Sequence, residues 1–254
     1  MNIRDRVYVA TYAENSLKAI KEYGLGMESN HICITECLDE ESTINTLRED
    51  VNYCNCKDNL IVHGPFTEII PMGIDGKIVE AGMERLNEAA EFAIKAGSKK
   101  MVFHTGLITD MYYDSWHIEK SSKFWERFIK NKPDDFNICI ENVFETSPMA
   151  LKEIIDIIGD KRVGICLDIG HANARKNDYD IYDWIEILGK RIKHFHIHNN
   201  DGTKDSHKPL GDGSLDYHKV FDCITKNCDE CVTYTIESMN CIESIKWLEE
   251  GEYI

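Results

Sequence analysis

Short apolar runs rich in β-branched residues alternate with longer amphipathic segments along the whole 254-residue chain. This alternation is typical of βαβ units, in which helices join parallel strands. Most of the runs are continuously apolar, as expected for strands that are covered on both faces. The sequence therefore predicts eight parallel strands, at residues 7–11, 31–35, 60–62, 100–103, 138–140, 163–167, 192–197 and 232–236.

Segments with helical periodicity lie between these runs. The expected helices span residues 15–23, 42–53, 79–96, 116–129, 148–158, 182–188, 217–225 and 241–249. Eight strand–helix pairs favour an α/β fold, a single (β/α)8 TIM barrel over residues 1–254, because this fold takes about 250 residues. The alternative is an open doubly wound sheet, which is typically marked by a glycine-rich phosphate loop after an early strand. The sequence contains no such loop.

The charge of the chain limits its partners. A net charge of −16 argues against a general nucleic-acid binder, because phosphate backbones attract a basic surface. No apolar stretch reaches the roughly 18 residues of a membrane span, and the N-terminus lacks the apolar segment of a secretory signal. Ten scattered cysteines then indicate reduced thiols. We expect a cytoplasmic protein with no membrane or nucleic-acid partner; the sequence leaves open whether it forms a homo-oligomer.

From the third strand on, each predicted strand has a histidine or a carboxylate at or near its end. In a closed barrel the C-terminal ends of the strands converge on one axis, and active sites of this fold lie there. Three or four nitrogen or oxygen ligands are enough for a zinc or manganese ion. The candidate ligands, with those in the following loops, are His63, His104, Glu141, Asp168, His171, His196, Asp205, His207 and Glu237.

A single polar residue after a strand is usually a helix cap or a turn residue. Six consecutive strands with such residues are harder to explain in that way, because the barrel brings all of them together. Burying so much negative charge without a cation would be costly. We therefore expect a site for one to three divalent ions, with zinc or manganese as the candidates.

Three motifs resemble a known family. They are LDIGHAN around Asp168 and His171, then HIHNNDG, and then DSHKPLGDG. Over residues 61–237 the chain resembles the xylose isomerase-like barrel superfamily. This superfamily includes sugar and sugar-phosphate isomerases and epimerases, and also apurinic-site nucleases of the endonuclease IV type (AP endonuclease family 2).

The resemblance implies two different ligand sets. In the isomerase branch one metal ion would be held by Glu141, Asp168, His196 and Glu237. Glu141 and Glu237 would also act as acid and base, and His171 would contact substrate oxygens. In the nuclease branch three zinc ions are held. The additional ligands would be His63 and His104, which share Glu141, and His171, Asp205 and His207.

The chain also departs from both branches. Gly202 stands where the epimerases commonly carry an arginine, six residues after the histidine of the seventh strand. Against the nuclease branch, the loops carry few arginines and the chain is acidic. The LGDGSLD segment is more similar to the sugar branch.

Two enzymatic functions and one non-enzymatic function follow as hypotheses. The first is a metal-dependent isomerase or epimerase that acts on a small sugar or sugar phosphate through an enediolate, with two glutamates as acid and base. The alternative is a multinuclear zinc phosphodiesterase or apurinic-site nuclease. A barrel that binds a metal ion and a ligand without catalysis is the third.

Four further residues are candidate substrate contacts, although each also has an ordinary structural explanation. Phe66 would form a wall of the pocket, and Lys208 would meet a substrate phosphate unless it is a solvated loop residue. Tyr112 and Trp116 would form a lid over a sugar, or else a hydrophobic staple for the next helix. His194 and His198 flank His196 with a period of two, so either would replace it as a ligand if the strand register is shifted.

Overall fold

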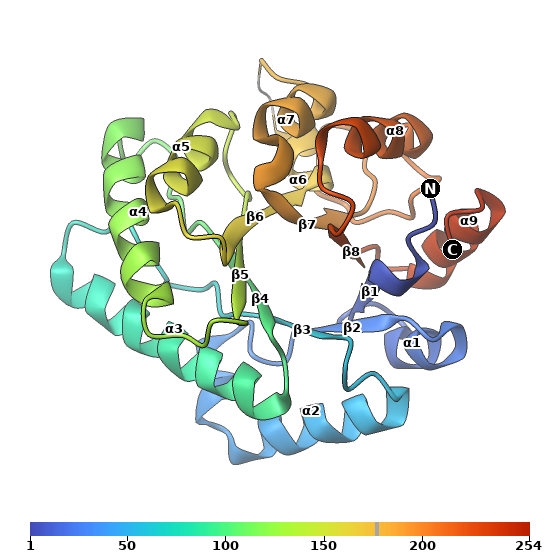
Figure 1. The fold of residues 1–254 in the computed structure, drawn as a ribbon, viewed down its shortest axis with the longest axis horizontal. Coiled ribbons are helices and arrows are strands. Elements are labelled where there is room, and N and C mark those ends of the chain that lie inside the picture. Colours follow the sequence, from blue (N-terminus) through green and yellow to red (C-terminus); the bar gives the residue numbers. More distant parts are fainter. Residues whose placement is uncertain (176–177) are drawn as a thin grey trace.

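The computed structural model describes residues 1–175 and 178–254. Its eight strands form a closed barrel in which each strand is parallel to both neighbours and follows the order of the sequence. Figure 1 shows the helices arranged as a ring around the barrel, with the two chain termini close to α9 (Cys241–Glu250). The predicted (β/α)8 barrel is confirmed.

The elements follow one another as the fold requires. The strands are β1 (Val7–Ala10), β2 (Gly26–Ser29), β3 (Leu60–His63), β4 (Lys100–His104), β5 (Asn137–Glu141), β6 (Val163–Asp168), β7 (Ile192–Ile197) and β8 (Thr233–Ile236). The other α-helices are α1 (Ser16–Tyr23), α2 (Glu41–Cys54), α3 (Gly76–Ala96), α4 (Asp114–Ile129), α5 (Met149–Ile158), α6 (Ile169–Ala174), α7 (Ile181–Leu188) and α8 (Tyr217–Asn227). In the described parts of the chain, no helix combines the length and the apolar character needed to cross a membrane.

The predicted second strand is wrong. Residues 31–35 form a turn that leads into a 3-10 helix, η2 (Thr35–Asp39), whereas β2 comes earlier, at Gly26–Ser29. Three of the four residues in β2, Gly26, Glu28 and Ser29, give no apolar signal. A Cβ atom at Gly26 would lie 2.3 Å from the ring of Tyr8, so this position must be a glycine. Glu28 is fully buried in the barrel, where a charged residue is not expected without a partner.

Apolar side chains form two separate layers. The large layer lies between the strands and the surrounding helices. A small cluster inside the barrel consists of Ile61, Val102, Cys139 and Cys166, with Tyr8 packed against it. The rest of the barrel interior contains buried polar residues, and these carry the candidate site.

Candidate metal centre

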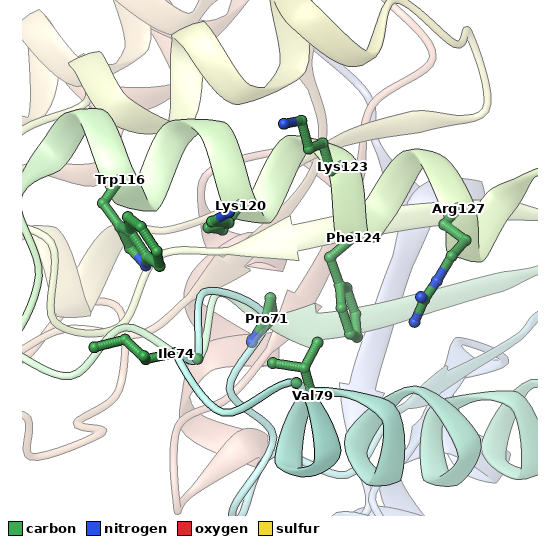
Figure 2. A pocket seen from close by; sticks show the side chains of 10 residues that line it. Pro71, Ile74, Val79, Trp116, Lys120, Lys123, Phe124 and Arg127 are labelled. Atoms are coloured by element: carbon green, nitrogen blue, oxygen red, sulfur yellow. The ribbon is translucent and has the colours of Figure 1, made fainter.

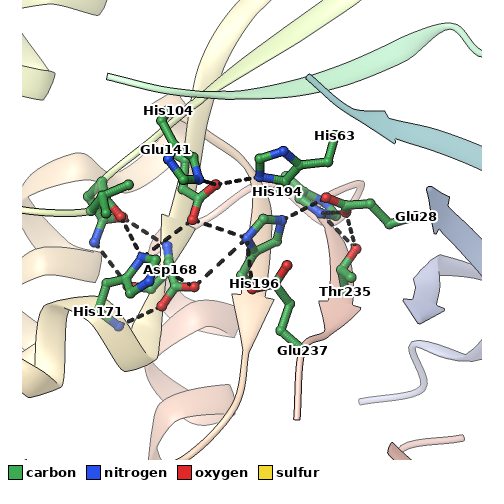
Figure 3. A network of polar contacts seen from close by, with 12 residues as sticks. Glu28, His63, His104, Glu141, Asp168, His171, His194, His196, Thr235 and Glu237 are labelled. Carbon is green, nitrogen blue, oxygen red and sulfur yellow. Dashed lines mark hydrogen bonds and ion pairs between the residues drawn. The ribbon is translucent and has the colours of Figure 1, made fainter. Parts of the chain in front are cut away.

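The C-terminal rim of the barrel brings together side chains from six consecutive strands. Because all strands are parallel in a closed barrel, their C-terminal ends lie on one side. Figure 3 shows that these side chains point toward one another. They are His63 at the end of β3, His104 at the end of β4, Glu141 at the end of β5, Asp168 at the end of β6, His196 in β7 and Glu237 just after β8.

Glu141 lies in the middle of this cluster and is only 1% exposed. Its Oε2 atom lies 3.2 Å from Nε2 of His63 and 3.4 Å from Nε2 of His104. Its Oε1 atom lies 3.4 Å from Nδ1 of His171 and 3.4 Å from Nδ1 of His196. The two oxygens face different pairs of imidazoles, so this carboxylate is placed to bridge two metal ions.

Asp168 joins the end of β6 to the first turn of α6. Its Oδ1 atom accepts a hydrogen bond from the backbone N–H of His171 at 2.6 Å and caps the helix. The same oxygen lies 3.1 Å from Nε2 of His198. Its Oδ2 atom faces Nδ1 of His196 at 3.8 Å. The helix cap thus fixes both the carboxylate and the segment that carries His171 into the cluster.

His196 has one nitrogen that lacks a hydrogen-bond partner among the described residues. This atom, Nδ1, is buried and lies 3.4 Å from Glu141, 3.4 Å from Glu237 and 3.8 Å from Asp168. The other nitrogen, Nε2, lies 3.0 Å from Oε1 of Glu28. An unpaired buried polar atom costs free energy. A cation bound between Nδ1 and the three carboxylates would remove that cost, so these residues fit a divalent ion.

Backbone carbonyls orient three other histidines of the cluster. Nδ1 lies within hydrogen-bond distance of the carbonyl of Gly64 for His63 (2.9 Å), of Asn142 for His171 (3.0 Å) and of Glu237 for His207 (2.8 Å). When Nδ1–H donates to a carbonyl, the lone pair is on Nε2. This pattern is typical of histidines that bind metals. Each of the three rings then presents Nε2 to a carboxylate of the cluster.

An outer group of candidate ligands lies at the edge of the cluster. Oδ2 of Asp205 lies 3.2 Å from Nε2 of His171 and 3.1 Å from Nε2 of His207. The Tyr12 hydroxyl donates to the carbonyl of Glu237 at 2.7 Å and contacts the ring of His207. The loop after β7 is therefore held against β8. Asp205 in this loop contacts both His207 and His171, the histidine of α6.

The pKa values of the clustered groups are shifted in opposite directions. Burial alone would raise the pKa of Glu141, but His196 and His104 lower it well below its usual range. Burial raises the pKa of Glu237, and the charge of Glu141 adds to that shift. Burial opposes protonation of His196, yet Cys166 and Glu237 raise its pKa well above the usual value. A metal ion on His196 would take the place of a proton, so metal binding would release protons.

The nine predicted ligands all lie in or beside this cluster. His63, His104 and Glu141 place one ligand atom each within 4.8 Å of one another, and so do His171, Asp205 and His207. Together with His196 and the three carboxylates around its Nδ1, these sets account for every predicted ligand. That they bind metal ions stays a prediction.

Sequence reasoning missed two residues that touch the cluster. Glu28 was missed because β2 was expected at residues 31–35, where no carboxylate points into the barrel. His198 contacts Asp168, and it was considered only as a substitute for His196. The alternation of histidines in HFHIH was the available signal, since residues two apart on a strand share a face. In the structure His196 lies at the centre of the cluster, whereas His194 contacts Glu28 on the side away from the rim.

A cavity of about 450 Å³ opens over the cluster. Phe66 lines it, as expected for a wall of the pocket, and its ring stacks on His104 with the centroids 4.5 Å apart. Tyr12 and Ile34 contribute to the lining as well. The cavity has room for a molecule of monosaccharide size beside the candidate ligands.

The other three predicted substrate contacts lie outside the described lining of this cavity. Trp116 faces a separate groove between α3 and α4 (Figure 2). Its indole N–H donates to the carbonyl of Met72 at 2.8 Å. Tyr112 lines a different hollow, beside the start of α4. Lys208 pairs through its backbone with Asn199, and its ammonium lies 3.4 Å from Asp212. These local contacts explain the positions of Trp116 and Lys208 without a bound substrate.

Comparisons with known proteins agree with this architecture. Residues 40–251 match the profile of a family described as xylose isomerase-like TIM barrel. An uncharacterized protein of Methanocaldococcus jannaschii is 27% identical over 196 residues, which are 74% of this chain and 67% of that protein. A protein named probable endonuclease 4 of Ureaplasma parvum serovar 3 is 25% identical over 186 residues, 66% of this chain and 61% of that protein.

A solved structure has nearly the same extent. A D-tagatose 3-epimerase-like protein superposes with a TM-score of 0.78 and 24% identity, covering 98% of this chain and 96% of that chain. At this level of identity the likeness shows the fold alone. The chain spans about two thirds or less of the length of the two sequence relatives named above.

Proposed function

The chain belongs to the xylose isomerase-like TIM barrel family, and we propose that this member is a hydrolase that cleaves a phosphate ester with two or three divalent metal ions. The observation that carries the proposal is the position of Glu141. Its two oxygens face separate pairs of imidazoles, at 3.2 and 3.4 Å on one side and 3.4 Å on the other. A one-metal enzyme has no need for the additional pair, whereas a bridging carboxylate is typical of multinuclear sites.

The residues divide into three sets of candidate ligands, and the first two of these share Glu141. Bound ions would polarise a phosphoryl oxygen and activate the attacking water. The first set is His63, His104 and Glu141; the second is Glu141, Asp168, His196 and Glu237; the third is His171, Asp205 and His207.

The remaining cavity residues would position the substrate and exclude water. Phe66 covers the ring of His104, and Ile34 adds an apolar surface to the cavity wall. Tyr12 also lines the cavity, and its hydroxyl contacts the carbonyl of Glu237 and Nδ1 of His207. A cavity lined by both polar and apolar groups suits a substrate with one hydroxylated and one less polar side.

We infer that the substrate is small. The chain has a net charge of −16, and the described lining of the cavity contains neither lysine nor arginine. A nucleic acid is attracted by a basic surface, so a polymer substrate is disfavoured. In the proposed enzyme the metal ions would supply the positive charge that a phosphate group needs.

A metal-dependent sugar isomerase or epimerase is the second candidate, and one observation favours it. The pKa of Glu141 is lowered while the pKa of Glu237 is raised, although both carboxylates lie beside His196. Two carboxyl groups with opposite shifts can serve as base and acid. In that reaction Glu141 would remove a proton next to a carbonyl, and Glu237 would donate one.

Metal counting combined with two assays separates the candidates. The purified chain would be loaded with zinc or manganese, and assayed with bis(p-nitrophenyl) phosphate and with a panel of ketoses. Two or three ions per chain with ester hydrolysis would support the hydrolase. One ion per chain with exchange of substrate carbon-bound hydrogen for solvent deuterium would favour the isomerase instead.

A further inference from the structure

A column of polar side chains runs through the barrel interior below the candidate metal centre. We call the five residues His196, Glu28, His194, Thr233 and Lys100 the axial column. Glu28 lies 3.0 Å from Nε2 of His196 through one oxygen and 3.0 Å from Nε2 of His194 through the other. Nδ1 of His194 lies 2.6 Å from the Thr233 hydroxyl, which is 2.9 Å from Nζ of Lys100. Lys100 is the first residue of β4, so the column reaches the N-terminal end of the barrel.

The donor and acceptor of each hydrogen bond in the axial column can be assigned by starting from Lys100, at the N-terminal end of the barrel. A lysine ammonium only donates, so Lys100 donates to the oxygen of Thr233. The Thr233 hydroxyl is then directed to Nδ1 of His194 at 2.6 Å, because its other acceptor, the carbonyl of Lys193, is 3.5 Å away. His194 therefore carries its proton on Nε2 and donates it to Glu28. The reverse tautomer would turn a lone pair toward the Glu28 carboxylate.

Glu28 receives its donors from three sides. Besides the two histidines, the hydroxyl of Thr235 donates to the oxygen that faces His194. A fully buried carboxylate is stable only when it is paired in this way. Because Glu28 accepts from Nε2–H of His196, the lone pair of that ring is left on Nδ1, on the side of Glu141, Asp168 and Glu237.

We propose that Glu28, Thr233 and Lys100 are positioning residues that fix the orientation and tautomer of His196 for metal binding. Carboxylates that accept the second N–H of a metal-binding histidine also make that histidine a stronger ligand. The axial column extends this effect to Lys100, at the opposite end of the barrel from the cavity. The inference rests on the metal binding proposed above, but it does not depend on the reaction.

A purely structural column would behave differently. Removing a partner from a buried polar network lowers stability whether or not a metal binds. If the column only holds the barrel together, variants lose unfolding free energy but bind zinc with unchanged affinity once folded. Zinc affinity and the tautomer of His194 therefore separate the two roles.

Three variants and three matched controls test the proposal. Glu28→Gln, Thr233→Val and Lys100→Met each remove one link of the axial column. Thr233→Ser keeps the hydroxyl, Lys100→Arg keeps a cationic donor, and Lys99→Met removes the neighbouring exposed lysine, which pairs with Asp135 outside the barrel. Zinc dissociation constants would be measured by competition with a chelator on each folded full-length variant. The tautomer of His194 would be read by ¹⁵N NMR of the metal-free protein.

We expect zinc affinity to fall about 10- to 100-fold in Glu28→Gln and at least several-fold in Thr233→Val and Lys100→Met, as for other partners of ligand histidines. The three controls keep wild-type affinity, and His194 carries its proton on Nε2 in the wild type but not in Thr233→Val. Wild-type affinity in Thr233→Val and Lys100→Met, with an unchanged tautomer, would overturn the inference while leaving metal binding intact. A wild type that takes up no zinc would overturn the proposed function and this inference together.

Discussion

Nε2 of His63 lies 3.2 Å from Oε2 of Glu141, and its ring is held there by a hydrogen bond from Nδ1 to the carbonyl of Gly64 at 2.9 Å. The other oxygen of the same carboxylate lies 3.4 Å from His196. One glutamate thus belongs to two sets of ligands. Whether both sets bind an ion decides between the hydrolase and the isomerase, because only the hydrolase uses the set that contains His63.

Replacing His63 distinguishes the two functions. His63→Ala should lower the zinc content by one ion per chain and reduce ester hydrolysis by at least about a hundredfold, since one half of a paired metal site is lost. The central residues Asp168, His196 and Glu237 stay in place. His218→Ala is the control, because His218 lies on α8 and bonds Tyr253 away from the rim. Full hydrolysis in the His63 variant would contradict a hydrolase that uses the set of ligands containing His63.

Replacing Glu141 should abolish activity in either mechanism. Glu141→Gln keeps the shape of the side chain but removes the charge that faces four imidazoles. Zinc content and turnover should both fall to background, while the circular dichroism spectrum of the metal-free protein stays that of the folded wild type. Wild-type turnover would mean that the active site lies elsewhere on the barrel.

The position of β2 can be tested by adding a methyl group. Gly26→Ala should destabilise the protein by about 1–3 kcal/mol, because its Cβ would meet the ring of Tyr8 at 2.3 Å. Gly76→Ala at the start of α3 is the matched control, since a Cβ there meets no atom within 4 Å. Urea unfolding gives both free energies. Equal stability of the two variants would contradict the strand at Gly26–Ser29.

A pH effect is expected from a histidine outside the candidate centre. His117 on α4 is 2% exposed, and burial lowers its pKa to about 4. In the unfolded chain its pKa is about 6.5, so between pH 6.5 and 4 the unfolded chain binds more protons than the folded chain. Stability from this group is therefore present above pH 6.5 and decreases as the pH falls toward 4.

His117→Gln should remove that part of the pH dependence. We expect the loss of unfolding free energy between pH 7 and pH 5 to be about 2 kcal/mol smaller in the variant than in the wild type. The measurement is urea unfolding of chelator-treated protein at both pH values, so that metal binding does not contribute. An identical loss in the two proteins would show that His117 keeps an ordinary pKa.

The sequence was sufficient to predict the barrel because many separate segments of the chain carry the same strand–helix pattern. Seven of the eight strands were expected at positions that overlap the observed ones, and continuous apolar runs marked most of them. The nine candidate ligands could be predicted for the same reason. Each of them lies near the end of a strand or in the segment after it, where the sequence shows that the strand ends, and a closed barrel brings such ends together.

The second strand and Glu28 could not be predicted because they depend on contacts with distant residues. Gly26 is required by the ring of Tyr8, and Glu28 is tolerated inside the barrel because His194 and His196 lie opposite it. The apolar residues within 31–35 suggested a buried strand, but this segment is not a strand and Ile34 is 53% exposed. For Trp116 the sequence left a lid and a hydrophobic staple open, and the structure shows its indole N–H donating to the carbonyl of Met72 near the start of α4.

The number of metal ions per chain tests the central claim most directly. Elemental analysis of the zinc-loaded protein, after removal of loosely bound metal, gives this number without any assumption about the substrate. The proposed centre predicts two or three zinc ions in the wild type and at least one fewer in His63→Ala. One ion or none in the wild type, with no change in the variant, would contradict a multinuclear site built around Glu141.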